Sequence, residues 1–173
     1  MNERTTVTPG SVGVRYGIIT GFISIIFSLI LYITGLHTNK AVTYVGMIIP
    51  IAGIVLAYNY FKKENNGYMS YGQGLGIGTL LATVSGVLSS IFAYIYLKFI
   101  DPNIIEQIRN SSIEEMERNG MSDEQIEAAT SMTEKFTTPE MMFIFGLIGA
   151  VFLGFIFSLI IAAIMKRNRP EFE

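Results

Sequence analysis

The sequence predicts an all-α, polytopic membrane protein in which four transmembrane helices form one bundle. Four stretches contain no Asp, Glu, Lys or Arg, and they cover residues 16–36, 41–61, 68–97 and 141–165. The shortest of them has 21 residues, and about 20 apolar residues in a helix span the hydrocarbon core of a bilayer. Half of the 173 residues are hydrophobic and only 15% are charged, against roughly 25% charged residues in ordinary soluble domains.

Other classes of protein fit this composition poorly. A soluble bundle needs a polar face on each helix, whereas residues 22–32 and 151–164 are apolar on nearly all sides. The first apolar stretch is longer than the roughly 7–15 residues of a cleaved signal peptide. The net charge of −2 gives no indication of a nucleic acid partner, and the lack of cysteine excludes disulfides and cysteine-based metal or redox sites.

The first two predicted transmembrane helices cover residues 14–36 and 41–61. Only four residues separate the two apolar stretches, so these helices should form an antiparallel hairpin. His37, the only histidine of the chain, lies in this connection. It has no carboxylate beside it in the sequence, and we interpret it as an interfacial loop residue rather than a metal ligand.

The third predicted helix covers residues 71–100 and follows an Asn-Asn-Gly turn at 65–67. Ser70 lies three residues before Gln73, which is the spacing of a capping box. Glycine alternates in segment 71–78, YGQGLGIG, which lacks the Lys-Ser/Thr of a phosphate-binding loop. Two interpretations of this segment remain: close helix packing, or a pliable helix start of the kind found at transporter sites.

Residues 101–139 are predicted to form an extracytoplasmic helical hairpin, and the fourth transmembrane helix follows at 140–166. Gly120 should end the first helix of the hairpin. Each helix start has side chains suited to capping, namely Asp101, then Ser122 with Gln125, and finally Thr138. We expect the apolar side chains of the hairpin to be largely buried, and these are Ile104, Ile108, Met116, Ile126 and Phe136.

The distribution of lysine and arginine predicts that both termini are cytoplasmic, because basic residues concentrate in cytoplasmic segments. The termini and the second loop carry seven of them, namely Arg4, Arg15, Lys62, Lys63, Lys166, Arg167 and Arg169. The first and third loops carry five, namely Lys40, Lys98, Arg109, Arg118 and Lys135.

Small residues recur at every fourth position in three of the predicted helices. Such spacing lets helix backbones approach closely in a membrane. The rows are Gly13, Gly17 and Gly21; Gly78, Ala82, Gly86 and Ser90; and Gly146, Ala150, Gly154, Ser158 and Ala162. We interpret them as packing faces within one bundle, with a dimerisation face or a pore lining as alternatives.

The predicted spans contain hydroxyl groups but no ionisable side chain of the kind that marks ion or substrate paths. We expect each hydroxyl to bond a carbonyl of its own helix one turn earlier. These residues are Ser24, Ser28, Thr79, Thr83, Ser85, Ser89, Ser90 and Ser158. The sequence shows no catalytic residue set, and we expect no catalytic, cofactor-binding or metal-binding residue.

The chain resembles a family of small, four-helix bacterial membrane proteins known only as a domain of unknown function. The resemblance rests on YMSYGQGLGIG at 68–78, FIDP at 99–102, MSDEQIE at 121–127, and the apolar segments 16–36 and 160–166. It implies four membrane helices and no assigned role, and we expect the chain to lie in the bacterial cytoplasmic membrane.

The leading functional hypothesis is a non-enzymatic scaffold or accessory subunit of a membrane complex. The lipid bilayer is the expected partner, with a second copy of the chain or another membrane protein as further candidates. The alternative is a small channel or carrier that uses the glycine-rich start of the third helix. A cavity that reaches the middle of the membrane beside Thr83, Ser85 or Ser89 would favour transport, and dry, close-packed helices would favour the scaffold.

Overall fold

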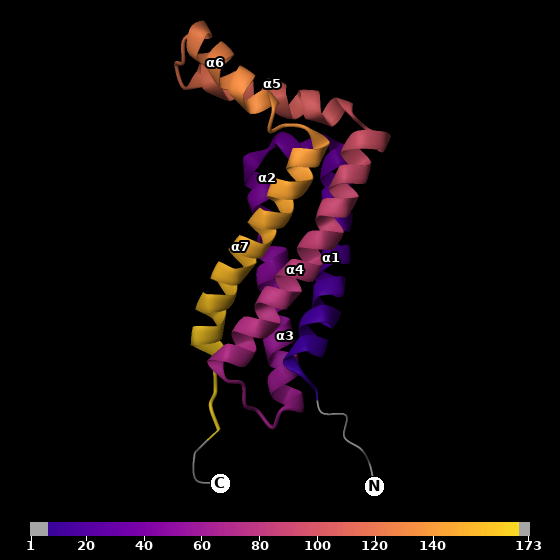
Figure 1. The fold of residues 1–173 in the computed structure, drawn as a ribbon, viewed down its shortest axis with the longest axis vertical. Coiled ribbons are helices and arrows are strands. Elements are labelled where there is room, and N and C mark those ends of the chain that lie inside the picture. Colours follow the sequence, from indigo (N-terminus) through magenta and orange to yellow (C-terminus); the bar gives the residue numbers. More distant parts are fainter. Residues whose placement is uncertain (1–6, 170–173) are drawn as a thin grey trace.

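A computed structural model describes residues 7–169 and shows the predicted all-α fold, with four candidate membrane spans packed together (Figure 1). Two shorter helices lie between the third and fourth spans, so the predicted fold class is confirmed. The spans are α1 (Pro9–Thr34), α2 (Lys40–Val45) with α3 (Ile48–Glu64), α4 (Tyr71–Ile95) and α7 (Pro139–Met165). The intervening helices are α5 (Asn103–Arg118) and α6 (Asp123–Glu134).

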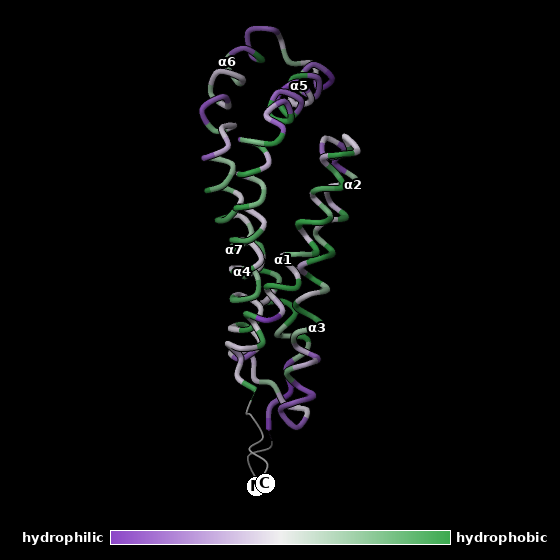
Figure 2. Tube along the Cα trace, turned by 90° about the vertical axis from the view of Figure 1, so that its right-hand side faces the viewer, coloured by the Kyte–Doolittle hydropathy of each residue, from purple (hydrophilic) through white to green (hydrophobic). Residues whose placement is uncertain are grey.

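Helix α4 is the central helix of the bundle and packs along both α1 and α7, while α3 crosses one face of these helices. Helix α1 begins and α7 ends at the same end of the bundle, here called the terminal end (Figure 1). The opposite end, the hairpin end, bears α5 and α6. Figure 2 shows a long hydrophobic middle section between two hydrophilic ends, as a membrane-spanning bundle requires.

Small residues of α4 face small residues of α7 along the whole length of their antiparallel crossing. A Cβ atom added at Gly154 would overlap the Cβ of Ala82, and one added at Gly86 would lie 2.9 Å from the Cβ of Ala150. The facing pairs form what we call the α4–α7 column: Gly74–Ala162, Gly78–Ser158, Ala82–Gly154, Gly86–Ala150 and Ser90–Gly146. Larger side chains at these positions would force the two helices apart.

The glycines of α1 make the corresponding contact on the other side of α4. A Cβ added at Gly13 would lie 3.0 Å from the Ile77 carbonyl oxygen, and one added at Gly17 would lie 2.7 Å from the Val84 Cβ. Gly21 faces Leu88 in the same way, at 2.9 Å from its Cδ1. The three glycines therefore let α1 approach α4 closely.

The second span is not the single helix predicted for 41–61. Helix α2 ends at Val45 and α3 begins at Ile48. Pro50 accounts for the break, because it has no N–H to bond the carbonyl of Gly46 four residues earlier and its ring clashes with that carbonyl. The part of the span that precedes the break can therefore leave the axis of α3.

The third span ends in one π turn, Tyr96–Ile100, in which the N–H of Asp101 bonds the Tyr96 carbonyl at 2.9 Å. Helix α5 starts at Asn103, one residue later than a cap at Asp101 predicts, although the Asp101 carboxylate still accepts the Asn103 N–H at 3.2 Å. Ile104 is buried with Tyr96 and Leu97. This apolar cluster seats α5 on the hairpin end of the bundle.

Side-chain caps mark the starts of five helices, and at α2 the Asn39 side-chain oxygen accepts the Val42 N–H at 3.3 Å. The Thr8 hydroxyl accepts the Ser11 N–H ahead of Pro9, so α1 begins earlier than residue 14. Ser70 and Gln73 form a reciprocal capping box at α4, and Ser122 and Gln125 form another at α6. Thr138 caps α7 through the N–H of Met141 at 3.3 Å.

Of the five apolar side chains expected to be largely buried in the hairpin, only Ile104 is buried. Ile108, Met116 and Ile126 are half-buried, and Phe136 is 52% exposed. Phe136 follows the end of α6, where it lies edge-on against Phe145 of α7 with ring centroids 5.8 Å apart. The prediction failed because helical periodicity cannot be extrapolated past the end of the helix.

Replacement of Gly154 by leucine should destabilise the bundle, because the new side chain collides with Ala82 in the α4–α7 column. Overpacking of this kind costs about 1–3 kcal/mol. Gly149→Leu is the matched control, since a Cβ at Gly149 meets no atom within 4 Å and the gain in helix propensity is the same. Thermal unfolding in detergent should show a lower Tm for Gly154→Leu than for Gly149→Leu, and equal Tm values would contradict the contact.

Candidate functional site

A cavity of about 310 Å³ lies in the half of the bundle toward the hairpin end, between α1, α3, α4 and α7. Met47 and Pro50 form the wall on the α3 side, and none of the described residues that line the cavity is charged. Five serines supply its polar groups, namely Ser24, Ser28, Ser85, Ser89 and Ser90. We call this space the serine cavity.

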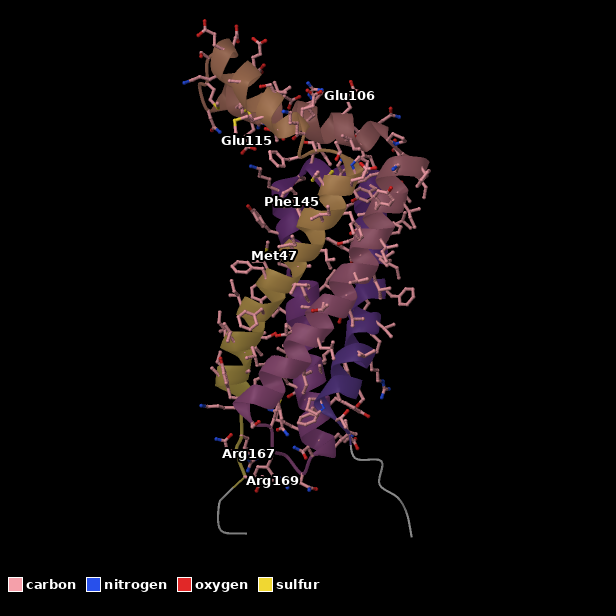
Figure 3. All side chains as sticks on the ribbon, in the orientation of Figure 1. Met47, Glu106, Glu115, Phe145, Arg167 and Arg169 are labelled. Carbon is pink, nitrogen blue, oxygen red and sulfur yellow. The ribbon has the colours of Figure 1, made fainter. Side chains whose placement is uncertain are left out.

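The serine cavity exists because the second span diverges toward the hairpin end. Figure 2 shows α2 set apart from α1, α4 and α7, whereas α3 joins them at the terminal end. Met47 is 40% exposed beside the break (Figure 3), as is Leu153 on α7, so the rim lies between α3 and α7. Toward the terminal end the core is closed by large buried side chains, including Tyr58, Phe61 and Leu81.

Most of the serine hydroxyls in the cavity are not bonded to their own helix, contrary to expectation. Ser85 donates to the Ala82 carbonyl at 3.2 Å. The hydrogen bonds found among residues 7–169 include none of the other four cavity hydroxyls, whereas they include that of Ser85. Outside the cavity the expectation holds for Thr83, which bonds the Thr79 carbonyl, and for Ser158, which bonds the Gly154 carbonyl. The cavity therefore presents free donors and acceptors within largely apolar walls.

The α4–α7 column forms one side of the cavity. Ala82, Gly86, Gly146, Ala150 and Gly154 all line it. Their small size brings the two backbones together and also removes side-chain volume from the face turned toward α3. The residues predicted from sequence to be packing residues thus also shape the cavity.

The glycine-rich segment 71–78 is regular helix and forms no break at the start of α4. Gly74 and Gly78 face Ala162 and Ser158 of α7, whereas Gly72 and Gly76 have no atom within 4 Å of an added Cβ. The break in the membrane helices lies in the second span instead. The structure of this segment therefore does not support its interpretation as a pliable helix start.

His37 lies in a second cavity, of about 250 Å³, between the α1–α2 connection and α5. Both ring nitrogens are buried and have no hydrogen-bond partner among the described residues, and the ring meets Tyr32 edge-on at 5.8 Å between centroids. Lys40 and Glu115 also line this cavity and form an ion pair between α2 and α5. In the described part of the chain, no three His, Asp or Glu residues are placed to hold a metal ion.

The spacing of the serines in the sequence indicates the serine cavity, whereas the presence of serines alone does not. Ser24 and Ser28, like Ser85 and Ser89, are four residues apart, so each pair lies on one face of its helix. Two such pairs on different spans are compatible with one shared site. Only the rotation of α1 and α4 about their axes decides that both pairs face the same space.

The family model described as "Protein of unknown function (DUF4199)" matches residues 15–167. The match covers most of the chain, so the chain belongs to this family, and the resemblance to a family of unknown function is confirmed. Comparisons with curated proteins and with solved structures found no match.

Enlargement of a serine side chain should be tolerated inside the serine cavity and harmful in the α4–α7 column. Ser89→Leu projects into the cavity and should leave the Tm unchanged or raised. Ser158 is fully buried against Gly78, so Ser158→Leu should cost about 1–3 kcal/mol through overpacking. Thermal unfolding of the two variants in detergent compares them directly, and an equal loss of Tm in both would show that the space beside Ser89 is not available.

Proposed function

We propose that this member of the DUF4199 family is a non-enzymatic membrane protein that binds a small, uncharged molecule in the serine cavity. The observation that carries the proposal is the cavity itself, which reaches the middle of the bundle beside Ser85 and Ser89. This is the feature that distinguishes a carrier or binding protein from a purely structural bundle.

The lining of the cavity indicates the chemistry of the ligand. The apolar walls are mainly alanine, glycine and methionine residues, and serine hydroxyls supply the polar groups. A charged ligand would lose hydration without gaining a charged partner, which is costly at this depth. The cavity therefore suits an apolar body that carries one or two hydrogen-bonding groups.

We favour a carrier over a channel with a continuous pore. The buried cluster around Tyr58, Phe61 and Leu81 closes the bundle toward the terminal end. Passage would need α3 to move away from this cluster, and the break between Val45 and Ile48 provides a discontinuity in the same span. Discontinuous helices are common at transporter sites.

Cysteine accessibility tests whether water and polar solutes reach the cavity, and the native chain has no cysteine to interfere. Ser89→Cys should react with a small, charged methanethiosulfonate reagent, because thiolates form in hydrated surroundings. Ile91→Cys is the control on the same helix, since Ile91 is 44% exposed on the apolar outer surface of the bundle. It should remain unreactive in membrane vesicles. An unreactive Ser89→Cys would show a dry cavity and favour the scaffold.

A scaffold or accessory subunit remains the second candidate, and a cleft in the hairpin supports it. The cleft has a volume of about 390 Å³ and lies between α5, α6 and the start of α7. Ile105, Ile108, Ile113 and Met116 of α5 give it an apolar wall. An apolar segment of a partner protein is the ligand that such a wall would fit.

Charge insertion into this cleft tests the scaffold role. Ile113→Glu should abolish co-purification of a partner from native membranes in mild detergent, because the carboxylate would enter the apolar wall. Gln107→Glu adds the same charge at an exposed position outside the cleft and should retain the partner. Equal recovery with both variants would remove the cleft as the partner site.

We place both termini in the cytoplasm of a bacterial cell, with the hairpin on the other side of the cytoplasmic membrane. The charge asymmetry of the two ends supports this orientation. Glu64 is the one acid at the terminal end among residues 7–169, against six bases, which are Arg15, Lys62, Lys63, Lys166, Arg167 and Arg169. In the same range, the hairpin end carries ten acids and five bases.

Impermeant thiol labelling of intact cells tests the orientation. A cysteine at Ser112 on α5 should be labelled, whereas a cysteine at Asn168 should be labelled only after the cells are permeabilised. Both positions are exposed, so a difference reports the side of the membrane. The reverse pattern would invert the topology.

A further inference from the structure

The chain that leaves α7 is held against the loop between α3 and α4 by a two-residue β-bridge. The N–H of Met69 bonds the Arg167 carbonyl at 2.9 Å, and the N–H of Arg167 bonds the Met69 carbonyl at 2.8 Å. Met69 is fully buried in the core cluster. The backbone at Arg167 is therefore fixed relative to the bundle.

The bridge brings two arginines to one tyrosine ring. In an extended segment, side chains two residues apart lie on the same side, and Arg167 and Arg169 both approach Tyr68. Their guanidinium carbons lie 5.7 and 5.9 Å from the centre of the ring, within the range of cation–π attraction. Arg169 also donates a hydrogen bond to the Asn65 side-chain oxygen at 3.2 Å. Figure 3 shows the two arginines together at the end of α7.

The arginines border a polar hollow of about 600 Å³, together with Tyr68, Ser70 and Gln73. Ser70 and Gln73 form the capping box of α4, so the positive end of that helix dipole lies beside the hollow. None of the four ion pairs found among the described residues includes Arg167 or Arg169. Two guanidinium groups in this setting favour an anion, and planar forked donors match phosphate oxygens.

We propose that this hollow, the Arg167–Arg169 site, binds the phosphate of an anionic phospholipid headgroup. Its depth along the bundle supports a lipid rather than a dissolved phosphate. Its lining residues precede or begin α4 and follow the end of α7, so it lies at the terminal ends of two membrane spans, which is the level of headgroups in a bilayer. The apolar outer surface of α4 and α7 then receives the acyl chains, and the bound lipid joins the ends of both helices to the α3–α4 loop.

The experiment is a lipid titration of the purified full-length protein in mild detergent, read by native mass spectrometry. Phosphatidylglycerol should bind more tightly than phosphatidylcholine. Arg167→Gln/Arg169→Gln should weaken phosphatidylglycerol binding by about tenfold or more, the loss expected when hydrogen bonds to a charged group disappear. Lys63→Gln/Lys166→Gln removes the same charge at the same end, outside the hollow, and should change the affinity by less than about threefold. Arg167→Lys/Arg169→Lys should fall between the two.

Each other outcome overturns the proposal in a distinct way. Equal losses in the arginine and lysine double variants would show diffuse charge attraction and no built site. Both lipids carry a phosphate, so equal binding of phosphatidylglycerol and phosphatidylcholine would show that the site does not select a headgroup with net negative charge. Displacement of the lipid by glycerol 3-phosphate at comparable concentration would assign the site to a soluble phosphate. Thermal unfolding without lipid checks that each variant is folded. If the arginine double variant is unfolded, Arg169→Gln alone replaces it, because this change leaves the bridge residue Arg167 intact.

Discussion

In the contact between α4 and α7, two antiparallel helices approach each other through residues that have little or no side chain. In lipid there is no hydrophobic driving force between helices, so membrane helices associate through close van der Waals packing. The α4–α7 column supplies that packing at every fourth residue, from Gly74–Ala162 to Ser90–Gly146. Helix α4 also receives the glycines of α1 on its other side. The positions of other elements follow from this three-helix arrangement. Helix α3 packs against α1, α4 and α7, and α5 packs through Ile104 on the apolar cluster at the hairpin end.

The same small residues explain why one half of the bundle is closed and the other is hollow. At the terminal end, Tyr58 and Phe61 of α3 fill the space that the column leaves open. Toward the hairpin end, the second span is broken around Gly46 and Pro50, and the space beside the cavity serines stays open. The serine cavity thus results from two local features: small residues on α4 and α7, and a proline in the neighbouring span.

The two ends of the molecule are stabilised by different interactions. At the hairpin end, the ion pair Lys40–Glu115 joins α5 to the second span, and the ion pair Lys98–Glu140 joins the end of the third span to the start of α7. Exposed pairs of this kind contribute only about 0–1 kcal/mol, so the burial of Ile104 in the apolar cluster is the stronger attachment of α5. At the terminal end, an excess of basic groups surrounds the Arg167–Arg169 site. A bilayer with anionic lipids would stabilise that end through its basic groups, of which none forms an ion pair within residues 7–169.

Much of the local structure could be predicted from the sequence, since it depends on properties that act along one chain segment. Stretches without charge identified the four spans, and the spacing of Ser122 and Gln125 indicated the capping box that starts α6. Features that require two distant segments could not be predicted in this way. The direction in which Ser24 and Ser89 point depends on the rotation of each helix about its axis, and the exposure of Phe136 depends on the path of the chain after α6. The sequence by itself determined which segments are helical and membrane-spanning, because length, hydropathy and capping are local. Only the tertiary structure decided which faces meet, where the cavity lies and which arginines converge, because these depend on backbone distances between residues far apart in the chain.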